Sequence, residues 1–209
     1  MSSRKRTDKE KVLSHFSKID PRLVSILEEI DFDEWFGQEI LDEDLIFKSL
    51  CRTIVGQQLA GKAADAIYKR FADLMDDEIV PDKLLGIDQD LVRGAGLSWA
   101  KVRSVFDLST KVKNGELMLR NLSKMENEEL IVELSKVKGI GRWTAEMFLM
   151  FRLGREDVFS WGDLGLKNGL KKYLGSEDMS FEEMKMVVDR WSPYRTYGAM
   201  AMWHLLDNR

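Results

Sequence analysis

The chain has 209 residues, of which 44% are hydrophobic and 33% charged, the composition of an ordinary soluble globular protein. This length suffices for one compact unit or for two small helical lobes that share a groove. The formal net charge of −4 argues against a nucleic-acid binder, although nearby charges decide the field around a groove. The sequence has neither an apolar run long enough to span a membrane nor the apolar segment of a secretory signal. We therefore expect a cytoplasmic or nuclear protein that is not secreted.

The inventory of cysteine and histidine limits the chemistry that the chain can perform. Cys51 is the single cysteine, which excludes an intramolecular disulfide, a four-thiolate iron–sulfur cluster and a zinc ribbon. His15 and His204 are the two histidines, and they leave little material for a His/Cys metal site or a Ser-His-Asp triad. If the chain is an enzyme, we expect its chemistry to rest on carboxylates.

Helical periodicity dominates the chain, and no segment shows the alternation that is typical of a strand. Residues 1–18 are expected to form a flexible basic tail, and residues 19–209 a single helical domain. Asp20 and Pro21 mark the start of the first helix, as a cap residue followed by a proline at the first helical position. Further helices are expected over residues 42–55, 61–75, 81–86, 88–95, 98–112, 126–136, 141–152, 163–174, 180–191 and 194–206. The pattern predicts an all-α orthogonal bundle of about ten helices joined by short connectors.

The segment VKGIGRWTA at residues 137–145 predicts a tight turn between two helices, within a motif of about 134–145. Gly139 and Gly141 allow positive φ angles or a close approach of the backbone to a ligand, and Ile140 between them can enter the core. The first N–H groups of the following helix have no partner within the helix and carry the positive end of its dipole. A DNA phosphate fits such a helix start, although the pattern alone equally fits a glycine-rich turn without a ligand.

A fainter version of this pattern occurs at residues 95–102, with the sequence AGLSWAKV. Both segments contain a glycine, an aliphatic residue, a small residue and a tryptophan in this order, followed by a helix. The repetition suggests two hairpin-like turns, of which the one at 137–145 is closer to the ideal.

Asp163 stands at the start of the helix expected over residues 163–174. An aspartate at this place is usually an N-cap, worth about 1 kcal/mol, so a purely structural role remains open. Trp161 lies just before it, and a large aromatic beside a carboxylate is typical of a binding pocket. Trp143 and Trp203 are further pocket candidates, with core packing as the alternative.

Together these segments resemble the helix–hairpin–helix superfamily of base excision DNA glycosylases, and within it the 3-methyladenine DNA glycosylase II (alkylpurine glycosylase) family. The resemblance runs from about residue 45 to about residue 206. Four blocks carry it in order: IVGQQL at 54–59, VKGIGRWTA at 137–145, GDLGL at 162–166 and WSPYRTY at 191–197. It implies two helical lobes that flank a cleft for DNA and for the excised base.

The resemblance also implies roles for individual residues. Asp163 matches the catalytic carboxylate of the family. Thr144 stands where bifunctional members carry a Schiff-base lysine, which implies a monofunctional enzyme without lyase activity. Gln58 and Leu59 match the wedge that enters the base stack. The base pocket is expected to contain Trp143, Trp161 and Trp203.

The glycine turn matches the hairpin that binds the DNA backbone in this family. The hairpin residues expected at the DNA backbone are Lys138, Gly139, Ile140, Gly141, Arg142 and Thr144. The resemblance further implies a monovalent cation, Na⁺ or K⁺, at the backbone carbonyls of Val137 and Ile140.

Three departures from the family leave the range of excised bases open. Gly162 replaces a second acidic residue that often precedes the catalytic one. Met147 and Leu164 stand where some members place tyrosines. The N-terminal β-domain of larger bacterial members is absent from this sequence.

The resemblance thus implies a monomeric DNA glycosylase that acts on damaged double-stranded DNA, with neither an organic cofactor nor an iron–sulfur cluster. Such an enzyme flips out a purine of the 3-methyladenine or 7-methylguanine type and hydrolyses its N-glycosidic bond through an oxocarbenium-like state, stabilised here by Asp163. One alternative is a glycosylase for another lesion, such as hypoxanthine, an oxidised base or a mismatched base. The other is a non-catalytic protein that uses the same hairpin fold to bind DNA or a partner.

Overall fold

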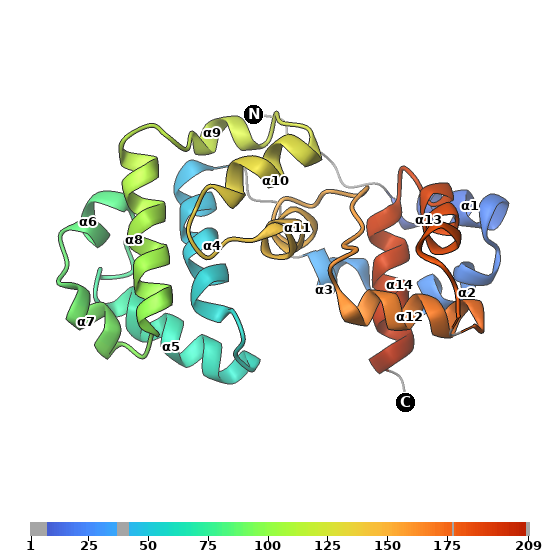
Figure 1. Ribbon diagram of the computed structural model, residues 1–209, viewed down its shortest axis with the longest axis horizontal. Helices are drawn as coiled ribbons and strands as arrows, with labels where there is room; N and C mark the ends of the chain where they lie inside the picture. Colours follow the sequence, from blue (N-terminus) through green and yellow to red (C-terminus); the bar gives the residue numbers. More distant parts are fainter. Residues whose placement is uncertain (1–7, 37–41, 177, 208–209) are drawn as a thin grey trace. The chain divides into compact units, whose positions relative to one another are not determined.

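A computed structural model describes residues 8–36, 42–176 and 178–207 (Figure 1). Within these ranges the chain forms fourteen α-helices and no strand, which confirms the all-α prediction. No helix in the described part of the chain is both long and apolar enough to cross a membrane. The chain divides into two compact units: unit 1 comprises Met1–Glu39 and Leu149–Arg209, and unit 2 comprises Ile40–Phe148. The two units correspond to the two lobes that the resemblance implies.

Unit 2 is built around two long helices, α4 and α8, which contact each other. It contains α4 (Glu43–Gly56), α5 (Gly61–Asp73), α6 (Pro81–Leu85), α7 (Gln89–Gly94), α8 (Trp99–Lys113), α9 (Leu119–Leu122), α10 (Asn127–Ser135) and most of α11 (Arg142–Phe151). The side chain of Asp42 caps α4, and Ser98 caps α8, so each helix has a defined first residue. Phe47, Leu50 and Leu108 are among the apolar side chains that the two helices bury.

Unit 1 is organised around the C-terminal helix, α14, which contacts α2, α12 and α13. It contains α1 (Lys9–Ile19), α2 (Arg22–Glu29), α3 (Phe32–Phe36), α12 (Leu164–Leu174), α13 (Phe181–Arg190) and α14 (Arg195–Asp207). A Cβ on Gly169 of α12 would lie 2.4 Å from the carbonyl oxygen of Met202 on α14. Glycine at this position therefore allows α12 and α14 to approach closely, which brings the start of α12 near the side chains of α14.

The predicted flexible tail over residues 1–18 is wrong for its second half. Residues 9–18 belong to α1, and two side chains on one face of that helix, Val12 and Phe16, are fully buried. The run of charges in this segment hides the spacing of the two apolar residues, which is that of neighbouring helical turns. Residues 1–7 lie outside the described part of the chain.

Two further helices were not expected from the sequence. Helix α3 has five residues and α9 has four, so neither is long enough to show a helical period. The segment just after α3, residues 37–41, is outside the described residues.

Candidate functional site

Asp163 is the N-cap of α12, and its carboxylate has a fixed orientation. One oxygen, Oδ1, accepts a hydrogen bond from the backbone N–H of Leu166 at 2.8 Å. The same oxygen accepts a second bond from the indole N–H of Trp203 on α14, at 3.2 Å. The side chain is half-buried. The capping role that the sequence suggests is thus correct, and the contact with Trp203 adds an aromatic neighbour that a simple cap does not require.

Trp203 belongs to an aromatic cluster that consists of Trp35, Phe151 and Trp203. The rings of Trp35 and Trp203 stack, with centroids 5.9 Å apart and planes inclined by 15°. Phe151 lies 5.7 Å from Trp203 and 6.0 Å from Trp35. All three side chains are partly exposed, so aromatic surface is accessible next to the Asp163 carboxylate. Such surface is suited to a flat, electron-poor ligand.

The other two predicted pocket tryptophans have different surroundings. Trp161 packs against Phe159 and Phe181, at centroid distances of 4.7 and 4.9 Å. These contacts direct its ring toward α13, and none of its ring contacts in the described residues involves the aromatic cluster. Trp143 lies near the start of α11 in unit 2 and exposes 47% of its surface.

The glycine turn between α10 and α11 forms as the sequence predicts. Val137 and Ile140 are buried, and the N–H of Ile140 donates to the carbonyl of Val137 at 3.0 Å. Gly139 has a φ of +81°, and a Cβ at this residue would lie 2.3 Å from Oγ of Ser104. Only glycine fits this position, because both the backbone angle and the space exclude a side chain. Lys138, by contrast, is exposed.

Arg142 was expected at the DNA backbone, and in the structure it is engaged by two carboxylates. Its guanidinium donates to both oxygens of Glu128 and to Oε1 of Glu146. The hydrogen bonds that Arg142 donates to Glu128 contribute most to raising the pKa of Arg142. A phosphate at this helix start would have to share the guanidinium with these two side chains. When each basic residue is considered separately, the sequence does not predict that Glu128 and Glu146 bind Arg142.

The predicted wedge residues follow the C-terminal end of α4. Gln58 is exposed and adopts a left-handed backbone, with φ of +58°, a conformation that costs of order 1 kcal/mol for a residue with a side chain. Leu59 exposes 37% of its surface. The residue before them, Gln57, was not singled out by the sequence. Its amide nitrogen donates to the carbonyl of Gly139 at 2.9 Å and to Oγ1 of Thr144 at 3.2 Å.

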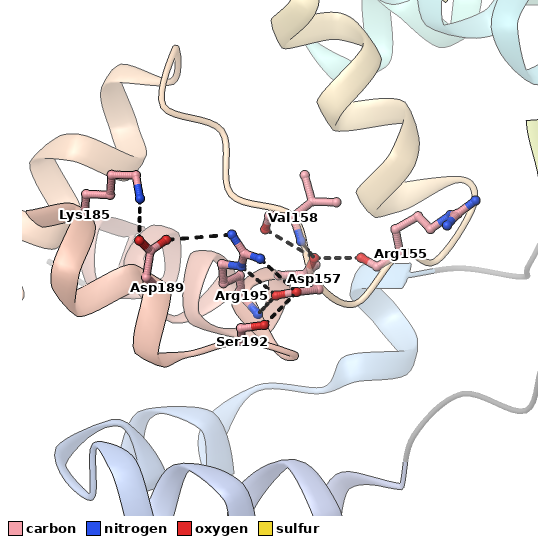
Figure 2. A network of polar contacts seen from close by, with 8 residues as sticks. Arg155, Asp157, Val158, Lys185, Asp189, Ser192 and Arg195 are labelled. Carbon is pink, nitrogen blue, oxygen red and sulfur yellow. Dashed lines mark hydrogen bonds and ion pairs between the residues drawn. The ribbon is translucent and has the colours of Figure 1, made fainter. Parts of the chain in front are cut away.

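A polar network anchors the segment that leads to Asp163 (Figure 2). Arg195 donates from Nε to Oδ1 of Asp157 at 2.7 Å and from a terminal nitrogen to Oδ2 at 3.0 Å. The hydroxyl of Ser192 donates to Oδ2 of the same carboxylate at 2.9 Å. Thr196 donates to the carbonyl of Arg155 at 2.6 Å and accepts from the N–H of Val158 at 3.0 Å. Three residues of the predicted block at 191–197 therefore hold the segment 155–158 against the start of α14.

Burial of Asp157 opposes its ionisation, but the hydrogen bonds from Arg195 and Ser192 and the charge of Arg195 outweigh burial and lower the pKa of this carboxyl. The pKa of Arg195 is raised in return, chiefly by its hydrogen bonds to Asp157. Both residues are therefore charged at neutral pH and form a bidentate ion pair.

A sequence profile of the HhH-GPD superfamily of base excision DNA repair proteins matches residues 51–193. The chain belongs to this superfamily. The matched residues contain the glycine turn, Gln58 and Asp163, and thus most of the positions that the resemblance singled out.

Individual relatives of this HhH-GPD chain are similar over most of its length. DNA-3-methyladenine glycosylase 1 of Schizosaccharomyces pombe is 34% identical over 164 residues, which cover 75% of this chain and 71% of the relative. The crystal structure of a DNA-3-methyladenine glycosidase from Bacillus halodurans matches with a TM-score of 0.77 and 33% identity, and covers 94% of this chain and 88% of that one. The 3-methyladenine DNA glycosylase of S. pombe in complex with abasic DNA matches with a TM-score of 0.75 and 29% identity, over 92% and 95% of the two chains. The resemblance to 3-methyladenine DNA glycosylases is thereby confirmed.

Proposed function

We propose that this HhH-GPD chain is a monofunctional DNA glycosylase that flips alkylated purines of the 3-methyladenine or 7-methylguanine type out of double-stranded DNA and hydrolyses their N-glycosidic bond. The observation that carries the proposal is the bond between Asp163 and Trp203, which joins a half-buried carboxylate to an accessible aromatic cluster. The names of the relatives support the substrate class, since they are called a DNA-3-methyladenine glycosylase and a DNA-3-methyladenine glycosidase. We further propose that the protein acts as a monomer in the cytoplasm or in a nucleus. The reaction proposed here uses water and needs no organic cofactor.

The aromatic cluster and the carboxylate suit the two charges that arise in this reaction. Alkylation at N3 or N7 gives the purine a positive charge, and the ring faces of Trp35 and Trp203 attract such a base by roughly 0.5–2 kcal/mol each. The charge weakens the glycosidic bond, so the base leaves with the bonding electron pair and the sugar becomes oxocarbenium-like. The ionised Asp163 stabilises that sugar and orients a water, whose oxygen bonds to C1′ while its proton is released. The products are a free base and an abasic site.

We assign DNA contacts to two exposed features of unit 2. Gln58 and Leu59 fill the gap that the flipped nucleotide leaves in the stack, because both are exposed on the short loop after α4. The turn at Lys138 and the first N–H groups of α11 bind a backbone phosphate through their partial positive charge.

The carbonyls of Val137 and Ile140 are proposed ligands for Na⁺ or K⁺. Neutral carbonyl oxygens are a suitable donor set for a hard monovalent cation, and the carbonyl of Val137 keeps a second lone pair beside its bond to the N–H of Ile140. The cation would add positive charge to the phosphate-binding turn. The proposal predicts a higher melting temperature in K⁺ or Na⁺ than in a bulky organic cation at equal ionic strength.

The deciding experiment measures the release of 3-methyladenine and 7-methylguanine from methylated duplex DNA. Wild type should release at least one of them, whereas Asp163→Asn should not, because it lacks the negative charge. Asparagine is an equally good N-cap, so the fold and the bond to Leu166 should persist. Asp207→Asn, which alters an exposed carboxylate at the end of α14, is the matched control and should retain full activity.

Two results would contradict this proposal. Excision by Asp163→Asn at the wild-type rate would remove the carboxylate from the mechanism. Release of hypoxanthine or an oxidised base, with neither methylated purine, would replace the substrate class and keep the reaction.

A further inference from the structure

We infer that Lys101 is a positioning residue for base flipping, because it fixes the wedge loop, residues 57–60, relative to the phosphate-binding hairpin at 137–141. The inference rests on the proposed function, which assigns Gln58 and Leu59 to the wedge. It deepens that proposal by naming the residue that couples insertion of the wedge to phosphate binding at the hairpin.

The ammonium group of Lys101 is bound to the backbone just before the wedge. Nζ donates to the carbonyl of Val55 and to the carbonyl of Gln57, at 2.7 Å each. Val55 lies in the last turn of α4, and Gln57 is its C-cap. Carbonyls at this end of a helix accept no N–H from within the helix, and they carry the negative end of its dipole. A lysine at this place neutralises that end and fixes where the chain leaves α4. Lys101 is half-buried, and this burial lowers the pKa of its ammonium group.

The same face of α8 also supports the hairpin. Lys101, Ser104 and Asp107 are spaced by three residues along α8 and therefore project from one side of the helix. Ser104 occupies the space against Gly139, where no Cβ fits. Oδ2 of Asp107 accepts the backbone N–H of Lys138 at 2.9 Å. One rigid helix thus carries both loops that the proposed function places on DNA.

Gln57 closes the connection between the two loops from the other side. Its backbone carbonyl accepts from Lys101, and its side chain donates to Gly139 and to Thr144. The next residue, Gln58, has the left-handed backbone that would relax if its neighbours were released. The wedge loop is therefore held at two places. Lys101 binds its backbone from α8, and the side chain of Gln57 connects it to the hairpin.

This arrangement separates a positioning role from direct DNA binding. Two of the three N–H donors of Lys101 are used by backbone carbonyls, so its charge serves the end of α4. Replacement of Lys101 should leave the number of phosphate contacts unchanged and disturb the geometry of the wedge. A lysine that binds phosphate would behave in the opposite way, since its loss weakens all DNA binding and reduces the salt dependence.

The test compares Lys101→Met with Lys113→Met, a control on the same helix whose ammonium pairs with Asp82 at the surface. The first probe is a duplex that contains a tetrahydrofuran abasic analogue next to 2-aminopurine, because a wedge that enters the stack raises the 2-aminopurine fluorescence without any excision. Lys101→Met should slow or reduce this rise by about 10- to 100-fold, the effect of a misplacement of about 1 Å. Affinity for undamaged duplex should stay within about twofold of wild type. Lys113→Met should match wild type in both measurements.

The second probe is excision of the same lesion in two settings, opposite a paired base and in an unpaired bulge. Flipping from a bulge costs little, so Lys101→Met should be slow on the paired substrate and close to wild type on the bulged one. Lys101→Gln keeps an uncharged NH2 group that can donate to the carbonyls, so its excision rate on the paired substrate should fall between those of wild type and Lys101→Met. This second variant guards against the case in which Lys101→Met does not fold.

Three outcomes would overturn the inference. Equal losses on paired and bulged lesions would indicate a general loss of structure. Weaker binding to undamaged DNA with a smaller salt slope would indicate a phosphate contact. A fluorescence rise identical to that of wild type would remove Lys101 from wedge insertion. If wild type releases no base and yet Lys101→Met abolishes the fluorescence rise, the inference stands and the proposed glycosylase activity fails.

Discussion

The indole N–H of Trp203 donates a hydrogen bond to Oδ1 of Asp163, and this bond connects the aromatic cluster to the carboxylate. Oδ1 also accepts the N–H of Leu166, so two donors from different helices converge on one oxygen. A carboxylate held in this way has little rotational freedom left. Trp203 therefore has two roles, since its ring stacks with Trp35 and its N–H orients the acid. The contribution of each role can be separated by substitution.

Trp203→Phe should preserve an aromatic ring and remove the N–H that orients Asp163. We expect the single-turnover excision rate to fall about tenfold, or ~1.4 kcal/mol, which is close to the lower end of what one hydrogen bond to a charged group contributes. Trp191→Phe is the matched control, because Trp191 donates the same kind of bond to Asp20 at 3.2 Å within the core. The control should lower stability and leave the rate of the folded enzyme unchanged. Equal losses of rate in both variants would contradict an orienting role for Trp203.

Thr144 should make this chain a hydrolase without lyase activity. The residue is buried, and its Oγ1 accepts the amide of Gln57, so it offers neither an amine nor a free position for one. Incubation with abasic-site DNA and borohydride should therefore give no covalent enzyme–DNA adduct, whereas a known bifunctional glycosylase in a parallel reaction should give one. A trapped adduct on the wild-type chain would show that another amine reacts and would end the monofunctional assignment.

The features that could be predicted from sequence are those fixed within a few residues. The glycine turn depends on Gly139 and on Ile140 beside it, and the cap of α12 depends on Asp163 and the helix that it begins. Contacts between distant residues could not be predicted. The bond from Gln57 to Gly139 spans 82 positions, and that from Lys101 to Val55 spans 46. No pattern within either segment indicates which distant backbone carbonyl a polar side chain will reach.

The same limit applies to the surroundings of the aromatic side chains. Trp35 was missed because it lies in a helix of five residues outside the four recognised blocks, and it joins Trp203 only in the folded unit. Trp161 was expected in the pocket by its proximity to Asp163 along the chain, but its ring packs on Phe181. Residues that are close in sequence have backbones that are close in space. The direction of a large side chain depends in addition on the neighbouring side chains against which it packs.

Gly139→Ala should destabilise the protein by about 2–4 kcal/mol. The left-handed backbone contributes roughly 1–2 kcal/mol, and the overlap with Ser104 adds the cost of overpacking. Ser104→Ala removes the oxygen that a Cβ on residue 139 would meet at 2.3 Å, and leaves the Ser104 Cβ at 3.2 Å. The double variant should therefore recover part of the loss, and urea unfolding of all four proteins measures that coupling. Strictly additive effects would mean that the overlap is relieved in another way.

Asp157→Asn should reduce stability at neutral pH and should matter less in acid. The pKa of Asp157 is lowered from 3.8 because the hydrogen bonds and charge of Arg195, with the bond from Ser192, outweigh burial. A lowered pKa means that the folded state favours the ionised form, so this stability is present above pH 3.8 and is lost as the pH falls toward the folded-state value. At pH 7 the variant also leaves Arg195 without its charged partner, and we expect a loss of about 1.5–3 kcal/mol.

Urea unfolding at pH 7 and at pH 3 tests this sign. The gap in free energy of unfolding between wild type and Asp157→Asn should narrow at pH 3, because wild type then loses part of what the ion pair contributes. Asp65→Asn is the control, since Asp65 pairs with Arg52 at the exposed surface, where such pairs contribute little. Other carboxylates titrate in both proteins and cancel in the comparison. A gap that stays the same from pH 7 to pH 3 would mean that the network of Figure 2 holds the segment 155–158 by shape and not by charge.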